Sequence, residues 1–136
     1  MAFHFRARAA LAAAAVAQDD PRTLLREALR CAGRLEHEGA RWGVILALLV
    51  RASAASLEGD RQAAMTFLER SEAEANALHI SQYVATCRYR RGTLLGGSEG
   101  QALIAEALAW AQSQRVVDPP RIFDMLAPGR WEATTA

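Results

Sequence analysis

The sequence contains no lysine, and all 16 of its basic residues are arginine. A phosphate-binding loop of the nucleotide-hydrolase type, a Schiff-base enzyme and a protein kinase each depend on a lysine side chain. The absence of lysine therefore excludes these three classes of site.

Cysteine is scarce as well, with Cys31 and Cys87 as its only occurrences. Two cysteines are too few for a disulfide framework, and a buried thiol packs like a small apolar side chain. We therefore expect both in the core of a cytoplasmic protein. Export is the alternative, because Arg6 and Arg8 precede an alanine-rich stretch ending at Ala17, but this stretch lacks the leucine-rich centre of a signal segment.

The chain has neither a large net charge nor a long apolar run. Its 16 basic and 15 acidic residues leave a net charge of +1, without the positive excess typical of nucleic-acid binding. The longest apolar run, residues 43–50, is far shorter than the roughly 18 residues of a membrane span. We expect one domain of 136 residues that folds without a metal, and neither nucleic acid nor a membrane as a partner.

Alanine is abundant, and no segment alternates apolar and polar residues as a surface strand does, so the sequence predicts an all-α fold. Asp20-Pro21 and Gly59-Asp60 combine residues that end one helix with residues that begin the next. Six helices are predicted, at residues 3–18, 21–38, 41–58, 61–78, 81–95 and 101–115. An apolar cluster of Ile122, Phe123, Met125 and Leu126, set between Pro119-Pro120 and Pro128-Gly129, predicts a short capping helix.

The sequence aligns with itself at a shift of forty residues. The aligned sets are small residues at Ala12, Ala52 and Gly92, turn or cap residues at Asp20, Asp60 and Gly100, and helix-interior residues at Leu24, Ala64 and Ile104, at Ala28, Leu68 and Leu108, and at Cys31, Ser71 and Ala111. Helices approach to about 8–10 Å only where side chains are small. We therefore predict three antiparallel hairpins over about 1–40, 41–80 and 81–117, followed by a cap and tail over 118–136.

This pattern resembles the tetratricopeptide repeat at Ala52, Ala55, Gly59-Asp60, Ala64, Leu68 and Ser71. It departs from the family in its longer period, since the family repeats every 34 or so residues, and in lacking the family's aromatic and closing proline positions. The resemblance implies a right-handed stack of hairpins that binds a protein or peptide and has no catalytic activity. The first helices would line the groove, at Leu46, Leu49, Ser53, Thr86, Tyr89 and Thr93.

The C-terminal third resembles the end of the helical-repeat regions attached to large bacterial serine/threonine protein kinases. The resemblance is carried by residues 94–102, by Val117 to Arg121 and by Met125 to Gly129. It implies that the chain is the C-terminal part of a bacterial signalling protein. No kinase motif is present in the chain itself.

Arginines offer a second candidate binding surface. Arg22, Arg26, Arg30 and Arg34 recur every four residues and so form a stripe along one helix. The stripe is interpreted as a solvated face, with an anionic partner or a facing acidic helix as the alternatives. Near Tyr89 lies a smaller basic cluster of Arg88, Arg90 and Arg91, of which Arg88 is a candidate contact for an acidic peptide.

The remaining motifs favour structural roles. The glycine-rich stretch 96–100 follows no strand and precedes no lysine, so it is interpreted as a turn. The three histidines have no partner at metal-ligand spacing, so we expect no metal and no cofactor. Trp42 is expected in the core.

The predicted N-terminal helix, residues 3–18, is the exception, because its stretch from Ala7 to Ala17 contains only Arg8 as a charge. End units of a repeat stack need a polar outer face, so this helix should be covered. A homodimer formed through it is therefore an alternative function, and a small-molecule sensor or enzyme with a pocket between helices is a less favoured one.

Overall fold

The computed structural model describes residues 2–132, which form seven α-helices and no strand. The helices are α1 (Ala2–Val16), α2 (Arg22–His37), α3 (Arg41–Leu57), α4 (Arg61–Ala77), α5 (Ser81–Leu95), α6 (Gly97–Ser113) and α7 (Pro119–Leu126). The all-α prediction is confirmed, including the short last helix. Residue 1 of the predicted first hairpin and residues 133–136 of the predicted tail lie outside the described residues.

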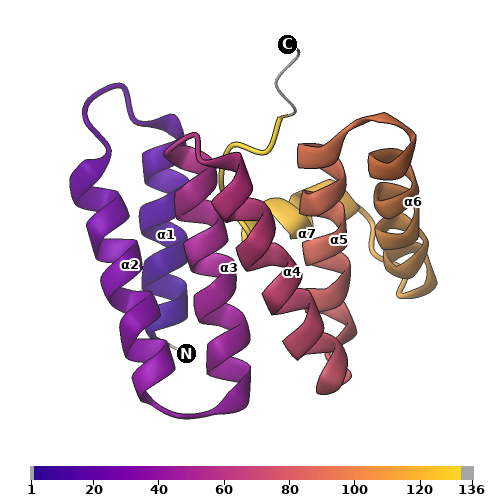
Figure 1. The fold of residues 1–136 in the computed structure, drawn as a ribbon, viewed down its shortest axis with the longest axis horizontal. Helices are drawn as coiled ribbons and strands as arrows, with labels where there is room; N and C mark the ends of the chain where they lie inside the picture. Colours follow the sequence, from indigo (N-terminus) through magenta and orange to yellow (C-terminus); the bar gives the residue numbers. More distant parts are fainter. Residues whose placement is uncertain (1, 133–136) are drawn as a thin grey trace.

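Helices α1 to α6 run alternately up and down, and each packs against the next along the chain (Figure 1). Helix α1 also packs on α3, and α7 packs on α5 and α6. This packing between adjacent helices is consistent with a helical repeat. It places α1, α3 and α5, the first helices of the three pairs, parallel to one another.

Left-handed residues end three successive helices at a spacing of twenty. Gly39, Gly59 and His79 have φ angles of 79°, 79° and 57°. A residue with a left-handed φ reverses the chain so that the next backbone amide can donate to a carbonyl in the last turn of the helix. After His79, for example, the Ile80 amide donates to the carbonyl of Ala75 at 2.9 Å. These turns keep the links between neighbouring helices short and the helices antiparallel.

Helix α3 is the centre of the molecule. Residues 45–50 are all buried, because α1, α2 and α4 pack around this helix. Trp42 is an exception to the prediction: it lies in the first turn of α3 and is 38 % exposed. Gly43, the next residue, faces α2 instead, where a β-carbon would lie 2.8 Å from the carbonyl oxygen of Leu35.

The forty-residue register holds at some of the aligned positions and fails at others. The aligned Cys31, Ser71 and Ala111 are all buried, as is Ala52. Ala12 and Leu108 are exposed, so neither forms the predicted interior contact. Gly100 is not a turn, because α6 begins at Gly97 and Gly100 is buried within it.

Candidate peptide-binding face

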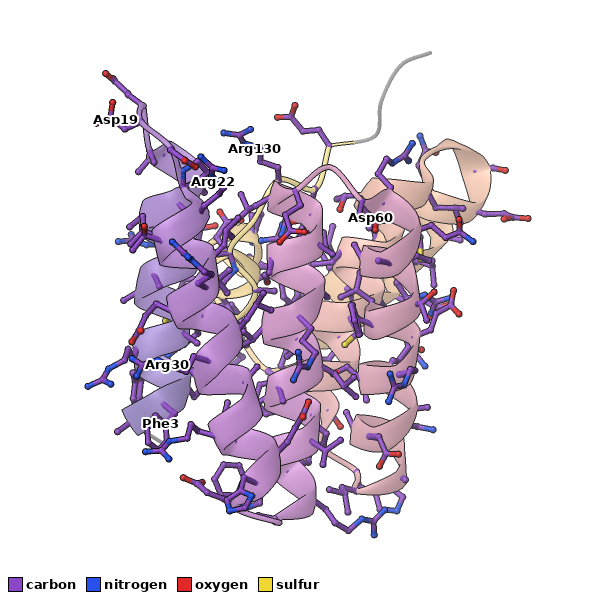
Figure 2. All side chains as sticks on the ribbon, turned by 60° about the vertical axis from the view of Figure 1, so that its left-hand side comes forward. Phe3, Asp19, Arg22, Arg30, Asp60 and Arg130 are labelled. Atoms are coloured by element: carbon purple, nitrogen blue, oxygen red, sulfur yellow. The ribbon has the colours of Figure 1, made fainter. Side chains whose placement is uncertain are left out.

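The face formed by α1, α3 and α5 is covered by the C-terminal segment, which we define as residues 118–132. Figure 1 shows α7 and the chain after it crossing behind the other helices. Arg8 of α1 donates from Nη1 to the carbonyl of Met125 at 3.1 Å. At the end of α3, Ser56 Oγ accepts from the backbone amide of Arg130 at 3.1 Å, where Figure 2 also places Arg130.

Three residues of the C-terminal segment, at a spacing of four, are its apolar anchors. Phe123 and Ala127 are fully buried, and Trp131 is 5 % exposed. Phe123 lies in α7, Ala127 caps that helix and Trp131 follows the next turn, so their burial, and not a helical period, identifies them as anchors. The Phe123 ring stacks on Tyr89 of α5 with 4.6 Å between ring centroids, and Trp131 belongs to the same apolar cluster as Leu49 of α3.

Arg90 of α5 supplies the polar contacts to the segment and is itself only 5 % exposed. Its Nε and Nη2 donate to the carbonyl of Ala127 at 3.2 and 2.9 Å, and Nη2 pairs with Asp124 at 2.8 Å. The guanidinium also lies 5.3 Å from the Trp131 ring centroid. Burial lowers the pKa of Arg90, while Asp124 opposes that shift. A buried charge is tolerable only when it is paired in this way.

Gly129 allows the segment to approach α3 closely. A β-carbon on Gly129 would collide with the hydroxyl of Ser56 and would lie 2.9 Å from the indole nitrogen of Trp131. That nitrogen donates to the carbonyl of Ala127 at 2.9 Å. The turn at Pro128-Gly129 therefore directs Trp131 onto the face and satisfies its polar atom.

The six residues predicted to line an open groove lie beneath this cover or within the core. Leu46, Leu49, Ser53 and Thr86 are buried, whereas Tyr89 and Thr93 are half-buried. Leu46 packs in the core cluster that joins α1, α2 and α3. The expectation of an open groove is thus corrected, because the C-terminal segment fills it. Leu49 and Tyr89 are the two of the six found with its anchors.

The arginine stripe on α2 is exposed but partly neutralised. Arg22 pairs with Asp20 and Arg30 with Glu27, each at 2.5 Å, and Figure 2 shows these two arginines at different heights along α2. The Arg34 guanidinium lies 5.3 Å from the centre of the Phe3 ring, and Arg26 is exposed. On α5, Arg88 pairs with Glu72 and Glu106. Most of these charges are therefore matched within the chain.

Arg90, Ala127, Gly129 and Trp131 are the site residues that the sequence analysis missed. Arg90 was grouped with Arg88 and Arg91 as part of a surface cluster, whereas the structure buries it. The signal present in the sequence was a pair of large aromatic residues, Phe123 and Trp131, on either side of Pro128-Gly129.

The histidines and cysteines form no reactive or metal-binding group in the described part of the chain. No set of three or more histidine, cysteine or acidic side chains there could hold a metal ion. Cys31 and Cys87 are free and buried, as predicted, and burial raises the pKa of both thiols, that of Cys87 to about 12. Low thiolate content makes both poor nucleophiles.

Over residues 2–132, no helix combines the length and apolar character that crossing a membrane requires. No family model matches the chain, and neither curated proteins nor solved structures give a match. The likeness to tetratricopeptide and kinase-linked repeats remains a prediction from the residues alone.

Proposed function

We propose that this chain is a non-catalytic, tetratricopeptide-like interaction module that holds a peptide segment on the face formed by α1, α3 and α5. The proposal includes the right-handed stacking of the three hairpins. It also includes a cytoplasmic role at the C-terminal end of a bacterial signalling protein, for which the sequence resemblance is the support.

The observation that carries the proposal is how the C-terminal segment is bound. Two aromatic anchors, Phe123 and Trp131, are buried, while Arg90 donates to the backbone carbonyl of Ala127 and pairs with the carboxylate of Asp124. Anchoring by a few buried aromatic side chains, with arginine fixing the register, is a recurring mode of peptide recognition. The face therefore has the apolar and polar contacts that bind a peptide, and the C-terminal segment is one peptide that it binds.

The anchors account for most of the expected affinity. An aromatic side chain buries roughly 150–250 Å², which corresponds to about 4–6 kcal/mol at 25 cal/mol per Å². Part of that gain is lost in ordering the segment. Phe123 and Trp131 together therefore supply the largest favourable contribution to binding.

Cleavage between Val117 and Asp118 tests the proposal, because Val117 is fully exposed. A protease site inserted there is cut in the folded protein, and a labelled synthetic peptide of residues 118–132 is added. We expect the labelled peptide to exchange into the cleaved protein and raise its fluorescence anisotropy. If cleavage unfolds the protein, or if the peptide does not exchange, the segment is part of the fold and the proposal is wrong.

Substitution of Arg90 makes the test specific. Arg90→Lys in the cleaved protein should lower the affinity for the peptide by roughly tenfold or more. The reason is that lysine lacks the planar guanidinium, which can donate to two acceptors at once. Arg88→Lys is the matched control, since Arg88 is on the same helix and pairs with acidic residues outside the segment. Equal effects of the two substitutions would contradict the assignment of Arg90.

A second candidate function is self-association through α1. Phe5 and Val16 are 56 % and 79 % exposed, and Ala9 and Ala12 between them are exposed as well. These residues form an apolar stripe with small residues at its centre, where a second copy could approach closely. If this is the function, Ala12→Glu should lower the mass measured by light scattering from dimer to monomer, and Ala102→Glu on α6 should not.

A further inference from the structure

We propose that the C-terminal segment is an intramolecular competitor, and that the external partner carries the same chemical signature. That signature is an aromatic residue followed directly by an acidic one, a small residue four positions after the aromatic, and a tryptophan eight positions after it. This inference rests on the proposed function and adds the kind of partner and its regulation.

Each position of the signature corresponds to a contact on the face. The aromatic position is that of Phe123 on Tyr89, and the acidic position is that of Asp124 on Arg90. The small position is Ala127, which is fully buried and whose carbonyl accepts from Arg90. A larger side chain there would have no room, since protein interiors are close-packed.

The tryptophan position is defined by both stacking and hydrogen bonding. Trp131 lies beside the Arg90 guanidinium and donates its indole N–H to the carbonyl of Ala127. Phenylalanine or leucine would fill the apolar site without that donor. We therefore expect tryptophan to be preferred over other apolar residues in a partner.

The segment is joined to the helices by a link that can act as a hinge. Residues 112–118 are exposed apart from Val116, which is half-buried, and Arg115 has a left-handed φ of 57°. Pro119-Pro120 starts α7 as a rigid unit after this link. The segment can thus leave the face by changes in the link alone, without unfolding α1 to α6.

The segment also leaves one edge of the face open. A hollow of about 720 Å³ lies between the segment and the turn from α5 to α6, and Arg90, Asp124 and Trp131 line it together with Gly96 and Gln101. A partner can therefore make its first contacts next to Arg90 while the segment is still bound. On the outer side, Met125 is 55 % exposed and its side chain is free to vary.

The test uses the intact chain and a labelled synthetic peptide of residues 118–132. We expect the wild-type chain to bind this peptide weakly, because its own segment is present at high effective concentration. Trp131→Ala in the chain should raise the affinity for the unchanged peptide by roughly tenfold or more, because losing a buried anchor releases the face. Met125→Ala is the matched control and should leave the affinity at its wild-type value.

Two further measurements separate the possible outcomes. Circular dichroism shows whether Trp131→Ala keeps its helices. Asp124→Ala in the chain removes a weaker contact of the segment and should also raise the affinity for the labelled peptide, by a smaller factor. If the cleaved protein binds the peptide but neither variant of the intact chain binds it better than wild type, the competitor role is wrong and the peptide-binding function stands. If a peptide with Trp131→Phe binds as tightly as the wild-type peptide, the proposed signature is wrong at that position.

Discussion

Gly92 on α5 and Gly100 on α6 face each other in close backbone contact, with the Ile104 side chain beside Gly92. A β-carbon on Gly92 would lie 2.6 Å from the carbonyl oxygen of Gly100, and one on Gly100 would lie 2.5 Å from that of Gly92. The two helices therefore meet at a point that admits no side chain on either of them. This contact lies one turn from Leu95, where α5 ends and the chain reverses at Gly96 and Gly97.

Gly92→Ala should consequently destabilise the protein. The added methyl group would force α5 and α6 apart at a cost of about 1–3 kcal/mol, which exceeds the gain in helix propensity. Gly33→Ala is the matched control, because Gly33 lies inside α2 with open space around its β-carbon position. That substitution should raise the free energy of unfolding by about 0.5–1 kcal/mol. Urea titrations followed by circular dichroism compare the two, and the same sign for both would contradict the close contact.

The same glycines show where sequence reasoning succeeds and where it fails. Helix ends depend on local residues, so Gly59-Asp60 and Pro21 placed the predicted boundaries within a few residues of the observed ones. Gly100 has the local character of a turn residue, yet its position inside α6 is determined by Gly92 on another helix. Tertiary contact therefore decided the one boundary that the sequence misplaced by four residues.

The candidate site was harder to predict for a related reason. Arg88, Arg90 and Arg91 look equivalent in the sequence, and the burial of Arg90 depends on Asp124 and Ala127, which are 34 and 37 residues away. The face of α1, α3 and α5 was predicted as the inner face of a stack, whereas its covering by residues 118–132 was not predicted. A single sequence offers no measure of which apolar surface an end segment will cover.

His79 offers a way to increase stability. It ends α4 with a φ of 57°, a conformation that costs an L-amino acid about 1–2 kcal/mol and costs glycine little. The side chain is exposed, so little packing is lost when it is removed. His79→Gly should raise the free energy of unfolding by about 1 kcal/mol. The reverse change, Gly59→Ala at a φ of 79°, should lower it by a similar amount, and both shifts are measurable as midpoints of chemical denaturation.

The two thiols should be unreactive in the native protein. Cys31 is 2 % exposed and Cys87 is fully buried, and burial holds the pKa of each thiol above its usual value. A thiol reagent at pH 8 should therefore label them only as fast as the protein opens, and both at once in denaturant. Ser98→Cys is the control, because residue 98 is exposed and should react at the rate of a free thiol. Immediate labelling of the wild-type chain would contradict the burial of both cysteines.

His4 should make stability depend on pH in the mildly acidic range. Its ring is 2 % exposed on α1, and neither nitrogen has a hydrogen-bond partner among residues 2–132. Burial, aided by the positive charge of Arg8, lowers its pKa to about 4. Between that value and the ordinary pKa of 6.5, the unfolded chain binds a proton that the folded chain does not. The free energy of unfolding should therefore be unaffected by His4 above pH 6.5 and should fall by roughly 3 kcal/mol as the pH decreases to 4.

His4→Leu removes this titration and also the two buried nitrogens that lack a partner. The variant should be at least as stable as wild type at pH 7, since an unsatisfied buried polar group is costly. Its stability should then fall less than that of wild type between pH 6.5 and pH 4, because the contribution of His4 to that fall is gone. His37→Gln, at an exposed position near the end of α2, should retain the wild-type slope. A His4→Leu protein with the full wild-type slope would place the titrating group elsewhere, because the slope measures the difference in bound protons between the unfolded and folded states.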